Sequence, residues 1–172
     1  KKISKRKKLK VKDITEVLVQ TENMRLPLVG SFQFKNLSMA ILAAKLCNVN
    51  YFKIKKALKE ISNIDGRLDL IKKFSNNRKI FIDYAHTPDA LNEVLKSIKE
   101  KYNNKISLVF GCGGERDYKK RSLMARVAKS MCDKIYVTDD NPRNENPKKI
   151  RKEIIKHLKK MNFKDIGNRS LA

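Results

Sequence analysis

The residues with the clearest potential for chemistry lie in the segment TDDNPRNENP, residues 138–147, which follows the apolar run KIYV. Turn formation accounts for its aspartates, asparagines and prolines, because these residues favour tight backbone turns. Turn formation does not account for Arg143, whose planar guanidinium can hold a carboxylate through two parallel hydrogen bonds. Arg143 is therefore a candidate for binding an acidic ligand. The alternative is that it only pairs with a nearby acid, namely Asp139, Asp140 or Glu145.

Two further polar segments, DYAHTPDA (83–90) and GCGGERDYKKR (111–121), also come directly after predicted strands. Ligands of open α/β sheets gather beyond the carboxyl ends of the strands. We therefore expect all three segments to line one rim of a sheet, so that residues distant in sequence form one site. The glycine-rich segment lacks the spacing of GxxxxGK[ST] or GxGxxG, so it does not indicate a cradle for a triphosphate.

The elements that must position these residues follow from apolar periodicity. Residues 14–20 (ITEVLVQ) alternate like a strand, and residues 24–30 (MRLPLVG) indicate either its partner or a connector. Helical spacing follows from Asn36 and again around residues 54–61. The remainder alternates between buried strands and helices. The strands are KIFID (79–83), ISLVF (106–110) and KIYVTD (134–139), and the helices carry residues 91–98, 123–131 and 150–158. This order predicts an α/β fold with a parallel sheet.

Composition narrows the classes of function. The 172 residues carry a formal charge of +23, but lysine is spread over every predicted helix with few aromatics between, which favours a solvated surface over a nucleic-acid groove. No run approaches the roughly 18 apolar residues of a membrane helix, and the opening residues lack the apolar segment of a signal peptide. We therefore expect a cytoplasmic protein. The three cysteines show no CxxC spacing, which argues against a disulfide framework and a zinc site.

Taken together and in order, several segments resemble the Mur ligase family, and within it the members that add diaminopimelate. The matching segments are LVGSFQFKNLSMAILAA, DGRLD, DYAHTPDAL, FGCGGERDYKKRSLM, TDDNPRNENP and GNRSLA. The resemblance implies that residues 1–64 are the C-terminal part of a central ATP-binding domain. Residues 65–172 would be a Rossmann-like C-terminal Mur ligase domain, incomplete at its end. The chain would then be an internal fragment, inactive alone and without catalytic residues of its own.

The reaction that the resemblance implies is ATP-dependent amide formation in peptidoglycan synthesis. The carboxylate of UDP-N-acetylmuramoyl-L-Ala-D-Glu is activated as an acyl phosphate, and the amine of meso-diaminopimelate attacks it. ATP and Mg²⁺ are the implied cofactors, with the metal ligands outside this chain and no metal site within it. We expect the intact protein to be a monomer that binds no nucleic acid and spans no membrane.

Site roles carry over from the resemblance by position. Asn36 corresponds to an asparagine near the adenine, Arg67 to an arginine that contacts the nucleotide, Asp83 to an aspartate at the ribose, and His86 to a residue close by. Gln33 stands where the family usually has asparagine. Without the resemblance, Asn36 could simply cap a helix and Asp83 could simply shape a turn.

The amino-acid substrate would be bound by the loop after the last predicted strand together with the neighbouring loop. The residues implied are Arg116, Asp140, Asn141, Pro142 and Arg143. Diaminopimelate carries a distal carboxylate that lysine lacks, and the guanidinium of Arg143 suits that group. Cys112 would lie near this site without acting as a nucleophile. Two alternatives remain: a Mur ligase that adds lysine, or a basic α/β module that binds RNA or an anionic surface.

Overall fold

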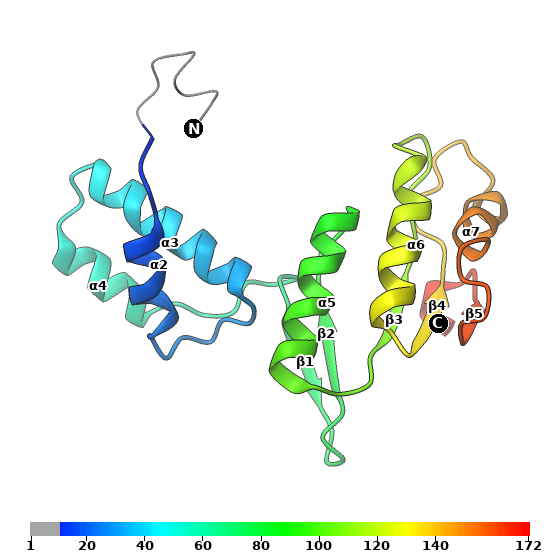
Figure 1. Cartoon of the computed structure of the whole chain (residues 1–172), viewed down its shortest axis with the longest axis horizontal. Helices are drawn as coiled ribbons and strands as arrows, with labels where there is room; N and C mark the ends of the chain where they lie inside the picture. Colours follow the sequence, from blue (N-terminus) through cyan, green and yellow to red (C-terminus); the bar gives the residue numbers. More distant parts are fainter. Residues whose placement is uncertain (1–10) are drawn as a thin grey trace. The chain divides into compact units, whose positions relative to one another are not determined.

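The computed structural model describes residues 11–172, and the chain divides into two compact units, Lys1–Ile64 and Asp65–Ala172. The first unit contains the helices α2 (Thr15–Glu22), α3 (Ser31–Leu46) and α4 (Tyr51–Lys59) (Figure 1). A small apolar core joins the three helices through Val17, Ile41 and Ile54.

The strand predicted over residues 14–20 is wrong, because this segment lies at the start of α2 and within it. Val17 and Thr21 are four residues apart and therefore lie on one face of the helix. Both are buried, and the hydroxyl of Thr21 lies 2.8 Å from that of Ser38 on α3. Packing against α3 thus outweighs the strand-like alternation. Residues 24–30 form a connector without a strand, as the second reading of that segment proposed.

Helix α3 begins at Ser31, five residues before the predicted start, with Gly30 at φ 90° before its first turn. Glycine suits this conformation because it has no Cβ. Asn36 therefore lies inside the helix with an exposed side chain, and the reading of Asn36 as a helix cap is wrong.

The second unit alternates strands and helices. Its elements are β1 (Asp69–Lys73), β2 (Lys79–Ile82), α5 (Pro88–Tyr102), β3 (Ser107–Phe110), α6 (Lys119–Met131), β4 (Lys134–Val137), α7 (Pro147–Ile155), β5 (Phe163–Asp165) and the short 3₁₀ helix η1 (Arg169–Leu171). Strands β3, β4 and β5 form a parallel sheet in that order, with Phe110 paired to Val137 at the carboxyl ends of β3 and β4. The predicted α/β fold with a parallel sheet is confirmed.

The core of this unit lies between the parallel sheet and its helices. Ile135 and Val137 of β4 are fully buried, as are Ala125 and Ala128 of α6 and Ile154 of α7. The small alanine side chains let α6 approach the sheet closely, so its first turn lies directly beside the loops that leave β3 and β4.

Strand β2 differs from the prediction in its partner and its burial. It pairs antiparallel with β1, and Ile80 and Ile82 are exposed. The predicted place of residues 79–83 as a buried strand of the parallel sheet is therefore wrong. Helix α5 lies against this hairpin in Figure 1, and the rings of Phe81 and Tyr102 are 5.5 Å apart. Strand β5, which completes the parallel sheet, was not predicted because it is only three residues long.

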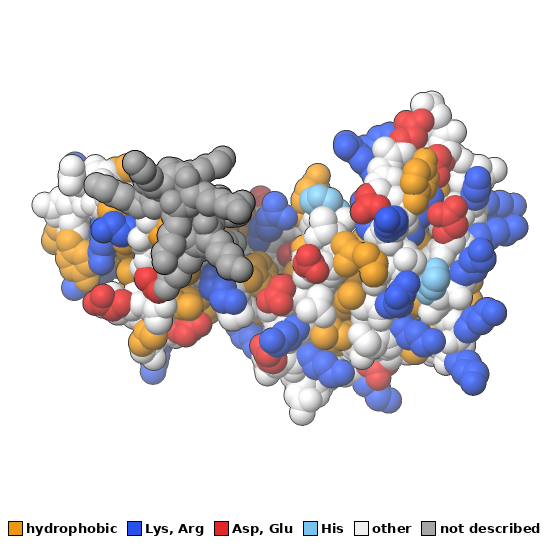
Figure 2. Space-filling model, turned by 45° about the horizontal axis from the view of Figure 1, so that its top comes forward, with side chains coloured by type: hydrophobic (Ala, Val, Ile, Leu, Met, Phe, Trp, Pro, Cys, Tyr) orange, Lys and Arg blue, Asp and Glu red, His pale blue; other side chains and the backbone are white. Residues whose placement is uncertain are grey.

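Basic side chains are not gathered in one place on the visible face of the second unit. Figure 2 shows Lys and Arg side chains spread over the visible face of the second unit, with Asp and Glu between them. Within residues 11–172, no helix combines the length and apolar character needed to cross a membrane.

Candidate functional site

Two loops at the carboxyl edge of the parallel sheet are locked together. The first (residues 111–118, the β3 loop) follows β3, and the second (residues 138–146, the β4 loop) follows β4. The amide of Gly114 donates a hydrogen bond to the carbonyl of Asn141 at 2.9 Å. A Cβ atom at Gly114 would overlap the carbonyl oxygen of Pro142 and lie 2.7 Å from its carbonyl carbon. Only glycine allows this approach of the two backbones.

Arg143 lies at the point where these loops meet. Its backbone has φ 49°, and its amide donates to the side-chain oxygen of Asn141 at 3.1 Å. Its Nη1 donates to the carbonyl of Gly114 at 2.6 Å, while the side chain as a whole stays exposed. Among residues 11–172, no acidic oxygen lies within ion-pair distance of Arg143.

The three acids that the sequence suggests as partners of Arg143 lie next to other arginines. Asp139 pairs with Arg151, Glu145 pairs with Arg121, and Asp140 lies 3.9 Å from Arg169. The reading of Arg143 as a local ion-pair partner is therefore wrong. The guanidinium of Arg143 is therefore exposed, and the β4 loop that carries it is held by hydrogen bonds to the β3 loop.

The remaining residues predicted for the amino-acid substrate lie on the same two loops. Asp140 is exposed and its carboxylate accepts from the amide of Asn141 at 2.9 Å. The carbonyl of Pro142 accepts from the amide of Glu145 at 3.0 Å, which closes a turn around Arg143. Arg116 is exposed on the β3 loop. The fold thus brings all five of these residues to one edge of the sheet.

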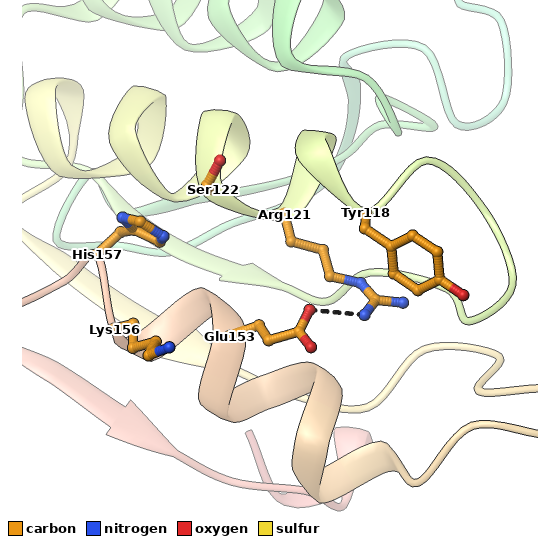
Figure 3. A pocket seen from close by; sticks show the side chains of 6 residues that line it. All are labelled: Tyr118, Arg121, Ser122, Glu153, Lys156 and His157. Carbon is orange, nitrogen blue, oxygen red and sulfur yellow. Dashed lines mark hydrogen bonds and ion pairs between the residues drawn. The ribbon is translucent and has the colours of Figure 1, made fainter.

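A buried arginine joins α6 to the β4 loop. Arg121 is 1% exposed, and its Nη2 donates to both carboxylate oxygens of Glu145, at 2.8 and 3.0 Å. Its Nη1 donates to Glu153 of α7 at 2.7 Å (Figure 3). The hydrogen bond from Arg121 is the main cause that lowers the pKa of Glu145 below its ordinary value. Glu145 is therefore ionised at neutral pH.

A second buried arginine holds the start of the β4 loop. Arg151 of α7 pairs with Asp139, and its Nε donates to Asp165 of β5 at 2.5 Å. The amide of Asp139 also donates to the carbonyl of Gly167 at 3.1 Å. The β4 loop is thus anchored at both ends by buried cations.

The residues predicted for the nucleotide form a second group on this unit. Asp83 accepts from the amide of Leu68 at 2.8 Å and from the amide of Ala85 at 2.7 Å, so it joins the segment before β1 to the loop after β2. Arg67 lies over the exposed ring of Tyr84, with 5.1 Å between the guanidinium carbon and the ring centroid. The carboxylate of Asp83 therefore has a structural role, because it shapes the turn after β2 and also holds the segment before β1.

His86 extends this group toward α6. Its ring lies edge-on to Tyr84 at 5.4 Å, and its carbonyl accepts from Lys120 Nζ at 3.3 Å. Lys120 is the neighbour of Arg121, so the first turn of α6 contacts both the loop after β2 and the β4 loop. Asn36, the fourth residue predicted for the nucleotide, lies in the other unit and its role stays a prediction.

Sequence reasoning missed Arg121, Arg151 and Tyr84. A signal was present for the arginines, because Arg121 shares helical spacing with Met124, Ala125 and Ala128, and Arg151 with Ile154 and Leu158. A charged residue on the core-facing side of a helix predicts a buried ion pair. No sequence pattern marked Tyr84, because its position beside Arg67 depends on the β1–β2 pairing.

Neither the pocket between α6 and α7, nor Cys112, nor the acidic and metal-binding side chains of residues 11–172 indicate a further site. The pocket in Figure 3, about 170 Å³, lies between α6 and α7 and contains none of the predicted site residues. Burial raises the pKa of the Cys112 thiol to about 11, so the thiol stays protonated and unreactive at neutral pH. Within residues 11–172, no group of three or more His, Cys, Asp or Glu side chains is placed to hold a metal ion.

A family model and several proteins of known sequence match this chain. The family model described as "Mur ligase, glutamate ligase domain" matches residues 66–171. A protein of Rickettsia montanensis named UDP-N-acetylmuramoyl-L-alanyl-D-glutamate--2,6-diaminopimelate ligase is 44% identical over 152 residues, which cover 87% of this chain and 31% of that protein. The Buchnera aphidicola (subsp. Schizaphis graminum) protein of the same name is 41% identical over 84% of this chain and 29% of its own length.

Solved structures agree with the fold. A structure of a ligase with the same name as these relatives has a TM-score of 0.58 and 34% identity, covering 85% of this chain and 30% of that one. A folylpolyglutamate synthase of Mycobacterium tuberculosis has a TM-score of 0.65 at 18% identity, over 83% of this chain and 32% of that one, which shows a shared fold. The chain thus spans about a third of the length of the relatives that it matches, and it belongs to the Mur ligase family, with the glutamate ligase domain over residues 66–171.

Proposed function

We propose that the protein to which this chain belongs is an ATP-dependent amide ligase. It adds meso-diaminopimelate to UDP-N-acetylmuramoyl-L-Ala-D-Glu through an acyl phosphate. The observation that carries the proposal is Arg143, which is exposed, has no acidic partner among residues 11–172 and is held by a hydrogen bond from its Nη1 to the carbonyl of Gly114. The relatives of highest listed identity carry this activity in their names and support the same substrate.

The chemistry of Arg143 favours diaminopimelate over lysine. A guanidinium has five N–H donors in a fixed fork, and one of them is used by Gly114. The remaining donors can bind the distal carboxylate of diaminopimelate, which a lysine substrate does not have. Arg116, exposed on the neighbouring β3 loop, adds a second cation for the same substrate. Asp140 and Asn141 supply acceptors for its ammonium groups.

The group around Tyr84 suits a nucleotide. It combines an exposed aromatic ring with the guanidinium of Arg67, and His86 lies beside the same ring. Arg67 would bind phosphate oxygens, because its fork matches their geometry. The second lone pair on each carboxylate oxygen of Asp83 could accept from a ribose hydroxyl while both backbone hydrogen bonds remain. Bound ATP would supply the phosphoryl group for activation of the dipeptide carboxylate.

A magnesium ion does not fit the described residues, since no acidic cluster among them could hold one. We therefore assign no step of this chain to a metal. The part played by residues 65–172 is to bind and orient the amino acid and to contact the nucleotide. Residues 1–64 would contribute Asn36 from the end of an ATP-binding domain. On this proposal the separate chain has no ligase activity, and the intact protein acts as a monomer in the cytoplasm.

The test is a pair of amino-acid titrations on the full-length protein at fixed ATP and dipeptide substrate. Loss of a hydrogen bond to a charged group costs roughly 1.5–3 kcal/mol, so Arg143→Ala should lower kcat/KM for diaminopimelate by about tenfold to hundredfold. Lysine, with no distal carboxylate, should lose much less, and the KM for ATP should stay the same. Arg143→Lys should restore part of the loss, because an ammonium cannot form the fork.

Arg126→Ala is the matched control, because Arg126 is an exposed arginine on α6 outside both loops. An equal loss for both amino acids in Arg143→Ala would show that Arg143 shapes the loop without contacting the substrate. A wild-type protein that prefers lysine would favour the lysine-adding alternative. Salt-sensitive RNA binding without ligase activity would favour the basic binding module.

A further inference from the structure

We propose that Glu145, held by the buried Arg121, is a positioning residue that sets where Arg143 meets the amino-acid substrate. The inference rests on the proposed function for the identity of that substrate. It assigns a role to Glu145 and Arg121, which are outside the two groups of residues predicted to bind the substrate and the nucleotide. It also predicts that, of the two carboxylates bound to Arg121, that of Glu145 affects substrate binding and that of Glu153 does not.

The carboxylate of Glu145 connects the β4 loop, to which it belongs, with the β3 loop and with α6; these contacts are called the joint. Its carboxylate accepts from Arg121 Nη2 at 2.8 and 3.0 Å and also from the backbone amide of Glu115 on the β3 loop. Its own amide donates to the carbonyl of Pro142 at 3.0 Å. One side chain therefore holds the β4 loop to α6 and to the β3 loop at the same time.

The contacts of Glu145 and Arg143 converge on the same stretch of the β3 loop. Glu145 binds the amide of Glu115, Arg143 binds the carbonyl of Gly114, and Arg121 Nη2 lies 3.4 Å from the carbonyl of Gly113. The three backbone groups that are bound belong to the consecutive residues Gly113, Gly114 and Glu115. A shift of Glu145 therefore moves the carbonyl that fixes the guanidinium of Arg143, which lies two residues away on the β4 loop.

Arg121 makes this joint rigid because it is buried. Its side chain is 1% exposed, and its Nε has no hydrogen-bond partner among the described residues. Removing one partner from a buried ion pair leaves a charge that water cannot reach. Any loss of Glu145 therefore forces Arg121 or the loop to rearrange, whereas an exposed pair would simply be replaced by solvent.

If Glu145 only stabilised the protein, its carboxylate and that of Glu153, which are both bound by Arg121, would be equivalent. Glu153 of α7 binds Nη1 at 2.7 Å, and among residues 11–172 no hydrogen bond or ion pair joins its carboxylate to either loop. Glu145 binds Nη2 and is part of the β4 loop. Neutralising each acid removes one charge from the same guanidinium, so Glu145→Gln and Glu153→Gln form a matched pair in which only the first changes the loops.

The experiment uses the full-length protein and compares steady-state kinetics of the two variants. We expect Glu145→Gln to raise the KM for diaminopimelate by about tenfold, the effect of one charge-assisted hydrogen bond, with kcat and the KM for ATP within about twofold. Glu153→Gln should leave all three constants within about twofold. Equal effects of the two variants on the KM for diaminopimelate, or no effect of Glu145→Gln, would overturn the positioning role.

Amide hydrogen exchange provides a readout that does not depend on activity. Peptides that cover residues 111–118 and 138–146 should exchange about tenfold faster or more in Glu145→Gln than in Glu153→Gln, because only the former opens the joint. Equal exchange in both variants would refute the joint itself. A wild-type protein inactive with diaminopimelate would contradict the proposed function, and the exchange comparison would still decide whether Glu145 holds the two loops.

Discussion

Gly114→Ala should break the lock between the β3 and β4 loops without changing any charge. The added Cβ would overlap the carbonyl oxygen of Pro142 and lie 2.7 Å from its carbonyl carbon. Both atoms are backbone, so no side chain can rotate away to make room. The two loops must separate, and the separation lengthens every hydrogen bond that crosses between them at this point.

The cost can be worked from the contacts that would be lost. The amide of Gly114 bonds to Asn141 at 2.9 Å, and its carbonyl accepts from the guanidinium of Arg143 at 2.6 Å. A neutral hydrogen bond contributes about 1 kcal/mol and one to a charged group about 1.5–3 kcal/mol. The substitution should therefore destabilise the protein by about 2.5–4 kcal/mol, and it should weaken diaminopimelate binding along with stability.

Gly66→Ala is the control, because Gly66 has φ +66° and no atom within 4 Å of an added Cβ. It should cost only the backbone strain of a left-handed residue, about 1–2 kcal/mol. The assays are thermal unfolding of the full-length variants and amide exchange of residues 111–118 and 138–146. Gly114→Ala should melt at a lower temperature than Gly66→Ala and exchange faster in both loops. Similar melting temperatures with unchanged loop exchange would refute the lock.

Three further outcomes are expected. Because the pKa of Glu145 is lowered in the folded state, its pair with Arg121 stabilises the protein above the ordinary glutamate pKa of roughly 4.3, and this stability falls as the pH drops through the lowered folded pKa. Unfolding titrations should show a weaker loss at acid pH in Glu145→Gln, and an unchanged profile would contradict this. Iodoacetamide at neutral pH should label the exposed Cys47 rapidly and the buried Cys112 only after unfolding, as mass spectrometry would show; fast labelling of Cys112 would disprove its burial. Ligase activity should survive Cys112→Ala, and its loss in a folded variant would make the thiol functional.

Several elements of the fold could be predicted from sequence because their apolar spacing repeats over many residues. Helix α5, with Leu91, Val94 and Leu95 on one face, and strands β3 and β4 are examples, and all three residues named are buried. Short segments contain too few repeats of such spacing to distinguish a strand from a helix. Residues 14–20 alternate like a strand over too few residues to exclude a helix, and packing of Thr21 against Ser38 decides for the helix.

In the candidate site, too, some features could be predicted from sequence and others depend on tertiary packing. Motifs in a fixed order are enough to indicate the family, and turn chemistry leaves Arg143 unexplained. The folded chain is needed to show that Arg143 does not pair with the nearby acids, because Glu145 is bound by Arg121, 24 residues away, and Asp139 by Arg151. In the sequence, helical spacing places these two arginines on the core-facing side of their helices but does not identify their partners. A buried cation must find a carboxylate, and that pairing depends on distances that a linear sequence does not contain.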